Sequence, residues 1–147
     1  MDDNPLTVLL VEDDPAHAEL LVRSFRRQRL EGRIVHVEDG EAALEYLFRE
    51  GRYADANDGM PSLIVLDLRL PRVDGLEVLR QIKTTPALAR IPVVILTTST
   101  AEQDVSRAYA LHANSYLVKP VDFGQYRALV GTMGVYWLEC NYFSHDV

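Results

Sequence analysis

Short apolar runs alternate along this chain with segments whose apolar residues recur at helical spacing. Runs of four or five residues match the length of buried strands, and a 3.6-residue period is typical of amphipathic helices. This alternation is the pattern of repeated βα units, which build one parallel sheet with helices packed on its faces. We therefore predict an α/β fold with parallel strands at Thr7–Val11, Arg33–Val37, Leu63–Leu66, Val93–Leu96 and Ser115–Val118.

The composition of each run indicates its place in the sheet. The first, third and fourth runs are almost wholly apolar, as expected of central strands that are covered on both faces. The second run, Arg33–Val37, contains an arginine and a histidine. We therefore predict that it lies at an edge.

The first predicted helix has a well-formed start, because the Asp14 side chain is an N-cap acceptor for free backbone N–H groups. The first helix also has proline at its first helical position. The fourth helix, Glu102–Leu111, is weaker because its apolar face is small. The five helices are expected to begin at Asp14-Pro15, Asp39-Gly40, Asp74-Gly75, Glu102 and Asp122.

Two stretches lie outside this repeating pattern. Arg49–Pro61 is a long polar segment before the third strand, and we predict that it is a surface loop. A tail at residues 139–147 carries aromatic side chains that we expect to be exposed. Five βα units fill the chain, so we predict a single domain over residues 1–147 with a core at about 6–138.

Charge and hydropathy narrow the possible functions. The 147 residues carry a formal charge of -7, which argues against nucleic-acid binding, because contacts to phosphates need clustered Lys and Arg. The one basic run, Arg23–Arg29, would fan over more than one helix face, which indicates a solvated surface. No apolar stretch approaches the roughly 20 residues of a membrane span, and Met1–Pro5 lacks the features of a signal peptide. We therefore expect a cytoplasmic protein with no membrane partner.

Cysteine and histidine give little sign of a metal site. Cys140 is the single cysteine, which excludes an intrachain disulfide and a cysteine-based metal site. The four histidines show no spacing typical of metal ligands, and we expect them to be structural or exposed. They are His17, His36, His112 and His145.

Polar residues stand at the ends of four predicted strands. Glu12 and Asp13 follow the first strand, Asp67 follows the third, Thr97 the fourth and Lys119 the fifth. In an open parallel sheet, ligands bind outside the carboxyl ends of the strands, so these side chains are expected to converge. A carboxylate cluster, a hydroxyl and an amine together indicate the handling of a phosphoryl group with a divalent metal.

The predicted carboxylate cluster needs a cation. Two like charges about 4 Å apart repel by about 4 kcal/mol at an effective dielectric constant near 20. Mg²⁺ suits such a cluster, because it takes oxygen ligands and is usually bound by one or two carboxylates with phosphate oxygens. Lys119 and Thr97 could hold an incoming phosphoryl group, and Asp67 could be its nucleophile, since carboxylates form acyl phosphates. Asp13-Asp14 alone would also fit a capped turn into the first helix.

The ordered set of motifs resembles the receiver domains of response regulators in two-component signalling. The resemblance covers essentially the whole chain, and the order and spacing of the motifs make it specific. The matching segments are Leu-Leu-Val-Glu-Asp-Asp, Leu-Asp-Leu-Arg-Leu-Pro-Arg-Val-Asp-Gly, Val-Ile-Leu-Thr-Thr and Tyr-Leu-Val-Lys-Pro.

The resemblance implies a flavodoxin-like, doubly wound sheet of strand order 2-1-3-4-5 with five helices. It implies that Asp67 accepts a phosphoryl group from a histidine kinase and that Thr97 and Lys119 contact the phosphoryl oxygens. The Lys119–Pro120 bond is expected to be cis. The groups implied to hold Mg²⁺, directly or through water, are Glu12, Asp13, Asp67 and the backbone carbonyl of Arg69.

The same resemblance implies a phosphorylation switch. Thr97 would move toward the phosphoryl group, and Tyr116 in the fifth strand would rotate inward. These movements would change the surface formed by the fourth helix, the fifth strand and the fifth helix. The physical requirement is a bistable element that a new local charge can bias.

The loop before the third strand and the Tyr136-Trp137-Leu138-Glu139 ending resemble stand-alone response regulators paired with bacterial phytochrome histidine kinases. The chain is then a phosphoacceptor signalling protein rather than an enzyme, and a bacteriophytochrome is its expected kinase. The fifth helix carries more apolar residues than one core face can use, and exposed apolar patches often mark interfaces. We therefore expect a homodimer through the fourth and fifth helices, with the C-terminal tail reaching the partner.

Three other functions fit parts of the sequence. An intermediate phosphate carrier in a phosphorelay would use the same residues. A metal-dependent aspartyl phosphatase usually needs a second acid shortly after its nucleophile, and position 69 is arginine. A binding module that works without phosphorylation would have no need of Asp67, Thr97 and Lys119.

Overall fold

The computed structural model describes residues 6–28 and 32–144, and this part of the chain has an α/β fold. Its five parallel strands form one sheet in the order β2-β1-β3-β4-β5, which confirms the predicted doubly wound topology. The strands are β1 (Thr7–Val11), β2 (Arg33–Val37), β3 (Leu63–Leu66), β4 (Val93–Thr97) and β5 (Ser115–Val118). The α-helices are α1 (Pro15–Arg27), α2 (Gly40–Phe48), α3 (Gly75–Thr84), α4 (Glu102–Ala110) and α5 (Phe123–Gly134).

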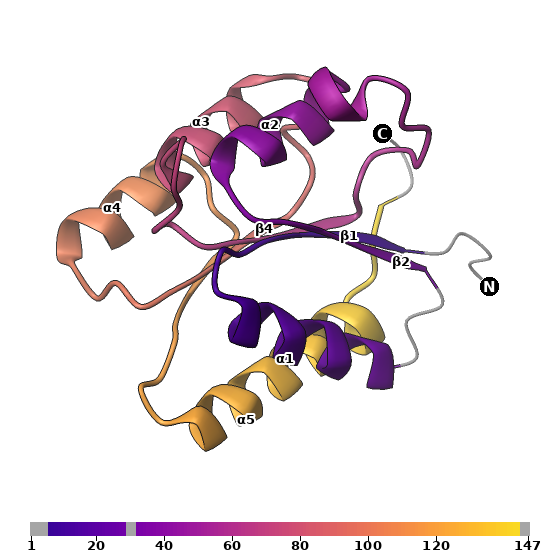
Figure 1. The fold of residues 1–147 in the computed structure, drawn as a ribbon. Coiled ribbons are helices and arrows are strands. Elements are labelled where there is room, and N and C mark those ends of the chain that lie inside the picture. The colour runs from indigo at the N-terminus through magenta and orange to yellow at the C-terminus, as the bar shows by residue number, and fades with distance from the viewer. Residues whose placement is uncertain (1–5, 29–31, 145–147) are drawn as a thin grey trace.

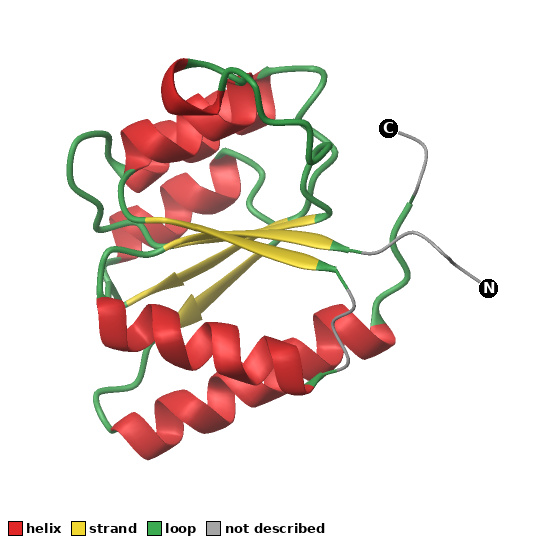
Figure 2. Ribbon diagram, turned by 45° about the vertical axis from the view of Figure 1, so that its right-hand side comes forward, coloured by secondary structure: helices red, strands yellow, loops and turns green. Residues whose placement is uncertain are grey.

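The sheet is the middle of three layers (Figures 1 and 2). α1 and α5 cover one face, and α2, α3 and α4 lie on the other. Alternate residues of β1 enter the two cores in turn, because successive side chains of a strand point to opposite faces. Leu9 and Val11 pack with α2 and α3, while Val8 and Leu10 pack with α1 and α5. The almost wholly apolar runs of β1, β3 and β4 thus correspond to strands buried on both faces, whereas β2 and β5 at the two edges are partly exposed.

The predicted start of α1 is confirmed. The Asp14 carboxylate accepts hydrogen bonds from the backbone N–H groups of Ala16 and His17, and Pro15 occupies the first helical position. The helices α2, α3 and α5 are capped in the same way by Asp39, Asp74 and Asp122. α4 has no side-chain cap and buries only Ala108 among its residues, in agreement with its weak sequence pattern.

The predicted surface loop between α2 and β3 has internal structure. It contains a short 3-10 helix, Gly51–Tyr53. The Asp58 carboxylate accepts hydrogen bonds from the Tyr46 hydroxyl at 2.9 Å and from the Arg33 guanidinium at 2.8 Å. These two contacts fasten the loop to α2 and to the edge strand β2.

The end of the chain corrects one expectation about apolar surface. α5 continues into a π-helix, Val135–Cys140, which includes the first two residues of the tail. Most of the apolar residues counted in this surplus pack against the chain's own core: Leu129, Val130, Met133, Trp137, Leu138 and Phe143. Val135, Tyr136 and Tyr142 are exposed. The tail therefore partly folds back, which leaves a smaller apolar surface than the composition of the helix indicated.

The prediction of a cis Lys119–Pro120 bond is wrong, since no peptide bond in the described residues is cis. The trans isomer is generally the more stable one for a bond before proline. With the bond trans, the backbone N–H of Lys119 donates to the Thr97 carbonyl at 2.7 Å, and the Lys119 side chain still reaches its partners. The contacts of the site do not require the less stable isomer.

Some predictions concern residues outside the described part of the chain. These are the start at Met1–Pro5, Arg29 at the end of the basic run, and His145–Val147 in the tail. Arg23, Arg26 and Arg27 are exposed on α1, as expected of a solvated surface. Within the described residues, no helix has the length and apolar character needed to span a membrane.

Candidate phosphoryl and metal site

The strand register brings the predicted site residues to one edge of the sheet. Val11 of β1 pairs with Leu66 of β3, so Glu12 and Asp67 follow neighbouring strand ends. Thr97 ends β4 and pairs with Val118, which places Lys119 just beyond the neighbouring end of β5. The parallel arrangement therefore gathers residues that are far apart in the chain.

The Lys119 ammonium lies between two carboxylates. Its Nζ donates to Glu12 Oε1 at 2.6 Å and to Asp67 Oδ2 at 2.8 Å. All three residues are buried, with 5% of Lys119, 2% of Glu12 and 6% of Asp67 exposed. Burial strengthens such interactions and also makes an unpaired charge costly. One ammonium cannot neutralise two carboxylates, so the site retains an excess of negative charge.

This imbalance affects the acidity of the site. Burial raises the pKa of Glu12 to about 7, although the hydrogen bond and charge of Lys119 oppose the increase. Burial alone would lower the pKa of Lys119, but its hydrogen bonds and charge interactions with Asp67 and Glu12 outweigh that effect and raise it. Lys119 thus stays charged, and Glu12 is the group that takes up a proton near neutral pH.

The second oxygen of Asp67 is held by the loop that follows β3. The backbone N–H of Arg69 donates to Asp67 Oδ1 at 3.0 Å. Gly75 at the start of α3 keeps this loop in place, because a Cβ at that position would lie 2.5 Å from the Leu68 Cα and 2.5 Å from the Asp67 carbonyl oxygen. The glycine of the Asp-Gly motif thus allows α3 to pack directly on the Asp67 loop.

The same edge has a donor set for a cation. Glu12, Asp13 and Asp67 each contribute a carboxylate oxygen, and these oxygens lie within 4.8 Å of one another. Asp13 is exposed, whereas the other two are buried. Carboxylate oxygens open to solvent on one side fit a hard divalent ion that keeps part of its water shell. No other group of three such residues occurs in the described part of the chain.

The two predicted switch residues meet at the segment between β4 and α4. Thr97 is fully buried, and its hydroxyl accepts from the backbone N–H of Ser99 at 3.4 Å. The Tyr116 hydroxyl donates to the Ser99 carbonyl at 3.0 Å. Tyr116 is half-buried and packs against the core beneath α3 and α4, so its side chain is turned toward this segment.

The Arg69 side chain has its partners outside the cluster of Glu12, Asp13 and Asp67. Its guanidinium donates to Asp104 Oδ2 on α4 at 2.8 Å and to Ser99 Oγ at 3.3 Å. The Arg69 side chain therefore links the Asp67 loop to the start of α4. Sequence reasoning did not identify Asp104 or Ser99, because nothing in their local pattern indicates a partner some 30 residues away.

His17 is a further site residue that the sequence did not indicate, since all four histidines were expected to be structural or exposed. Its Nδ1 lies 3.1 Å from Lys119 Nζ, next to the carboxylate cluster. Its position in the sequence could have identified it as a site residue. His17 lies in the first turn of α1, directly after the end of β1, where a side chain can reach the sheet edge. His36 is exposed, and its Nε2 lies 2.7 Å from the Glu12 carbonyl oxygen.

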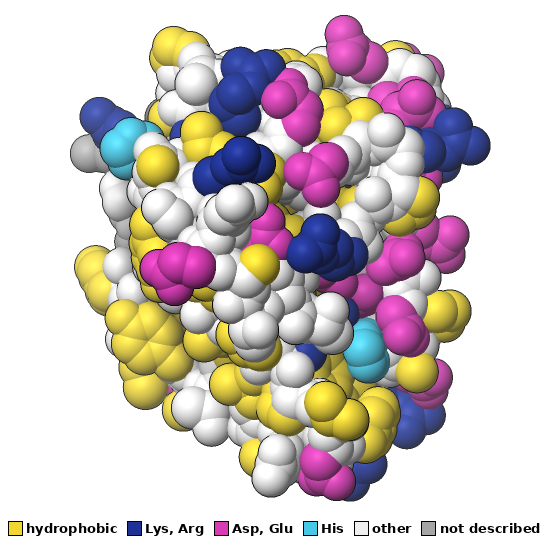
Figure 3. All heavy atoms as spheres, turned by 90° about the vertical axis from the view of Figure 1, so that its left-hand side faces the viewer, with side chains coloured by type: hydrophobic (Ala, Val, Ile, Leu, Met, Phe, Trp, Pro, Cys, Tyr) yellow, Lys and Arg dark blue, Asp and Glu magenta, His cyan; other side chains and the backbone are white. Residues whose placement is uncertain are grey.

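Figure 3 shows the end of the molecule that lies at the left in Figure 1. Charged side chains of both signs mix over its upper part, and hydrophobic side chains gather in its lower part, on the side where α5 begins. The large hydrophobic residues exposed between the end of β5 and the start of α5 are Val118, Val121 and Phe123.

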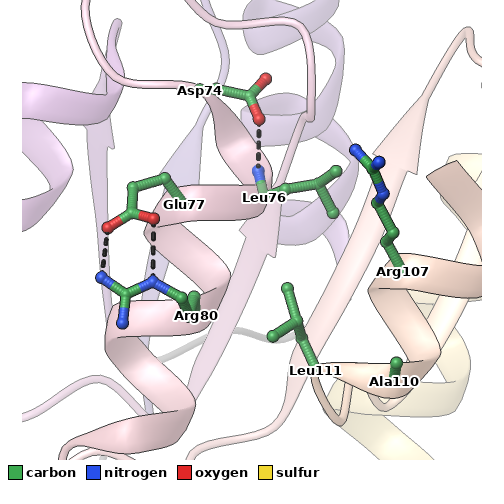
Figure 4. Close-up of a pocket in the computed structure, with 7 residues that line it drawn as sticks. All are labelled: Asp74, Leu76, Glu77, Arg80, Arg107, Ala110 and Leu111. Atoms are coloured by element: carbon green, nitrogen blue, oxygen red, sulfur yellow. Dashed lines mark hydrogen bonds and ion pairs between the residues drawn. The ribbon is translucent and has the colours of Figure 1, made fainter.

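A separate pocket of about 430 Å³ lies between α3 and α4 (Figure 4). Leu76, Ala110 and Leu111 form its apolar part, and Arg107 lies at its side. Its acidic residues already have partners, since Asp74 caps α3 and Glu77 pairs with Arg80 at 2.5 Å. None of the predicted site residues lines this pocket, so the strand-end cluster is the stronger candidate for chemistry.

Residues 8–130 match the model of the response regulator receiver domain. The chain belongs to this family. This receiver domain is 49% identical over 140 residues to the probable methanogenesis regulatory protein FilR2 of Methanothrix harundinacea (strain 6Ac), covering 95% of the chain and 88% of that relative. It is 42% identical over 135 residues to the response regulator Rcp1 of Synechocystis sp., covering 92% of the chain and 90% of Rcp1.

Solved structures of the same kind agree with the fold. The Mn²⁺-bound form of Rcp1 has a TM-score of 0.91 at 39% identity and covers 95% of this receiver domain and 99% of that chain. The phosphorylated cyanobacterial phytochrome response regulator RcpA has a TM-score of 0.89 at 39% identity, with the same coverage of 95% and 99%. The predicted resemblance to phytochrome-associated response regulators is thus confirmed.

Glu12 leads to a prediction about stability in the absence of metal. Its pKa is raised from 4.5 to about 7, so the folded protein binds this proton more tightly than the unfolded chain does. The stabilisation is complete below the unfolded pKa and is lost as the pH rises through the folded one. We expect the free energy of unfolding of wild type, relative to Glu12→Gln, to fall by roughly 1–3 kcal/mol between about pH 5 and pH 8.

Urea unfolding in the presence of a chelator measures this difference. Glu12→Gln is the matched reference, because glutamine keeps the shape of the protonated acid and does not titrate. A difference that stays constant over the whole pH range would contradict the prediction.

Proposed function

We propose that this protein is a response regulator whose Asp67 accepts a phosphoryl group from a histidine kinase. One observation carries the proposal. The Asp67 carboxylate has one oxygen on a buried lysine ammonium and lies in a cluster of carboxylate oxygens that can hold a divalent cation. A carboxylate that is held by a cation on one side and a backbone N–H on the other is oriented for attack on phosphorus.

The residues of the chain can carry out the transfer without a general base. An Asp67 oxygen forms the new bond to phosphorus, and the bond from phosphorus to the donor breaks. Lys119 lies where it can offset charge on the transferred group, and Thr97 ends the neighbouring strand β4. We propose both residues as the groups that contact the phosphoryl oxygens.

The proposed cation is Mg²⁺, held by Glu12, Asp13, Asp67 and the backbone carbonyl of Arg69. When bound, it supplies positive charge that stabilises the phosphoryl oxygens. The Mn²⁺-bound form of Rcp1 supports a divalent ion in this family. The donor set here consists only of oxygen atoms, which suits Mg²⁺ and Mn²⁺ alike.

The signal is proposed to travel through Thr97 and Tyr116. Both contact Ser99, so a displacement of Thr97 toward a phosphoryl group would move the segment that leads into α4. Arg69 joins the same segment through Ser99 and Asp104. A new charge on Asp67 therefore has direct contacts through which it can change the surface of α4, β5 and α5.

The proposed kinase is a bacteriophytochrome. Support comes from RcpA, a phytochrome response regulator whose chain is almost fully covered by this one. We propose that residues 1–147 form a single receiver domain that works in the cytoplasm. Its only chemistry would be self-phosphorylation with Mg²⁺ and slow loss of the phosphoryl group, so it would not be an enzyme in the usual sense.

Incubation with acetyl phosphate and Mg²⁺ tests the role of Asp67. We expect intact-mass spectrometry to show the gain of one phosphoryl group in wild type and none in Asp67→Asn, because the amide cannot act as the nucleophile. Asp55→Asn, an exposed acid in the surface loop, is the matched control and should keep the gain. Repeated hydrolysis of p-nitrophenyl phosphate would instead favour the phosphatase alternative.

Competition between kinases tests the proposed partner. We expect the phosphohistidine of a bacteriophytochrome to transfer to Asp67 at least about tenfold faster than that of an unrelated sensor kinase, as measured by radiolabel transfer. Equal rates would contradict the assignment. Rapid onward transfer to a histidine phosphotransfer protein would favour the relay-carrier alternative over an output regulator.

We also propose a homodimer through α4, α5 and the tail. Exposed aromatic and aliphatic side chains on α4, on the π-helix that continues α5, and in the tail support it: Tyr109, Val135, Tyr136 and Tyr142. Small-angle scattering at tens of micromolar protein should show a dimer, and Tyr136→Lys should shift it to monomer by placing a charge in the interface. Phe48→Lys on α2 is the control and should stay dimeric. A monomeric wild type would contradict the proposal.

A further inference from the structure

A third polar group, besides the two carboxylates, lies within hydrogen-bond distance of the Lys119 ammonium. The ammonium carries three N–H donors. Two point to Glu12 Oε1 and Asp67 Oδ2, and the His17 Nδ1 lies 3.1 Å from the same nitrogen. The three contacts account for all the donors of this buried cation.

The His17 backbone belongs to a capped helix turn, and its ring packs against a core residue. Its backbone N–H donates to the Asp14 carboxylate at 3.3 Å, which sets the first turn of α1. The ring packs against that of Tyr126 on α5, with centroids 4.7 Å apart. Tyr126 is itself buried in the core beneath α1 and α5. The imidazole therefore stands on a rigid support rather than in a mobile loop.

The contact also specifies the protonation state of the ring. An ammonium has only donors, so a hydrogen bond to Lys119 requires the lone pair of Nδ1 and a ring proton on Nε2. The same Nδ1 lies 3.6 Å from Asp14 Oδ2, which is farther than its 3.1 Å distance to Lys119 Nζ. Burial and the charge of Lys119 lower the pKa of His17, which favours the neutral ring. A neutral acceptor satisfies the third N–H without adding another negative charge to the site.

We propose that His17 is a positioning residue for Lys119 in the phosphorylation of Asp67. A lysine side chain has several rotatable bonds, and its ammonium can turn. With the third donor on His17, the other two are aimed at Glu12 and Asp67. Without this acceptor, a buried N–H is unsatisfied and the ammonium loses its fixed orientation toward the reacting carboxylate. The inference depends on the proposed phosphorylation of Asp67.

Two substitutions separate this role from simple packing. His17→Phe keeps an aromatic ring against Tyr126 but removes the acceptor. His17→Asn removes the ring and keeps an acceptor, since its Oδ1 branches from Cγ as Nδ1 does in histidine. We expect the rate of phosphorylation by acetyl phosphate with Mg²⁺ to fall about tenfold in His17→Phe, the effect of losing one hydrogen bond to a charged group. His17→Asn should restore most of that rate.

The outcomes are distinguishable. Equal rates for the two variants, whether both fast or both slow, would overturn the role of His17 while wild type still takes up the phosphoryl group. A wild type that takes up none would overturn the proposed function itself. Thermal unfolding confirms that both variants are folded before the rates are compared.

A spectroscopic measurement on wild type tests the inference without any variant. Long-range ¹H–¹⁵N spectra of the His17 ring at pH 7.5 should show an unprotonated Nδ1 and a proton on Nε2. A charged ring, or a ring with its proton on Nδ1, cannot accept from Lys119 and would overturn the inference even if His17→Phe fails to fold.

Discussion

The Lys119 ammonium stands between two buried carboxylates, and the rest of the site depends on this arrangement. Its single positive charge offsets Asp67 and Glu12 only in part, so one negative charge remains in a place with little water. A proton on Glu12 or a divalent cation can supply the missing charge. The exposed Asp13 extends the cluster toward solvent, where such a cation can enter. The unphosphorylated site is thus prepared for the charge chemistry of a receiver domain.

The sheet makes this concentration of charge possible. Parallel strands end at one edge, and the order β2-β1-β3-β4-β5 sets β1, β3 and β4 side by side at its centre. Apolar strands buried on both faces hold those ends rigidly. Helices also start at the same edge, so α1 brings His17 to the site and Gly75 allows α3 to close on the Asp67 loop. The packing of the two cores holds the carboxylates together at the sheet edge although they repel one another.

Particular residues show where sequence reasoning succeeded and where it failed. The central strands β1, β3 and β4 were predictable, because burial on both faces leaves a continuous apolar run in the sequence. The helix cap at Asp14 was predicted from the sequence, and the caps at Asp39, Asp74 and Asp122 are equally local, because each depends on neighbouring backbone groups. The contacts of Arg69 with Asp104 and of His17 with Lys119 were not, since they join side chains brought together only by packing. The apolar residues of α5 and of the segment after it indicated a larger exposed surface than the structure has. Their packing against the chain's own core also joins elements far apart in the sequence.

By itself, then, the sequence determined the alternation of strands and helices and the location of the polar residues at the strand ends. It also determined that these residues match the ordered motifs of a receiver domain. These properties depend on local periodicity, local capping and residue type. Only the tertiary structure decided which acceptors share the Lys119 ammonium, where the Arg69 guanidinium points and how much of the C-terminal segment covers its own core. Those outcomes depend on how closely elements far apart in the chain approach and on which side chains they bury. Small differences in packing determine which partner a side chain contacts.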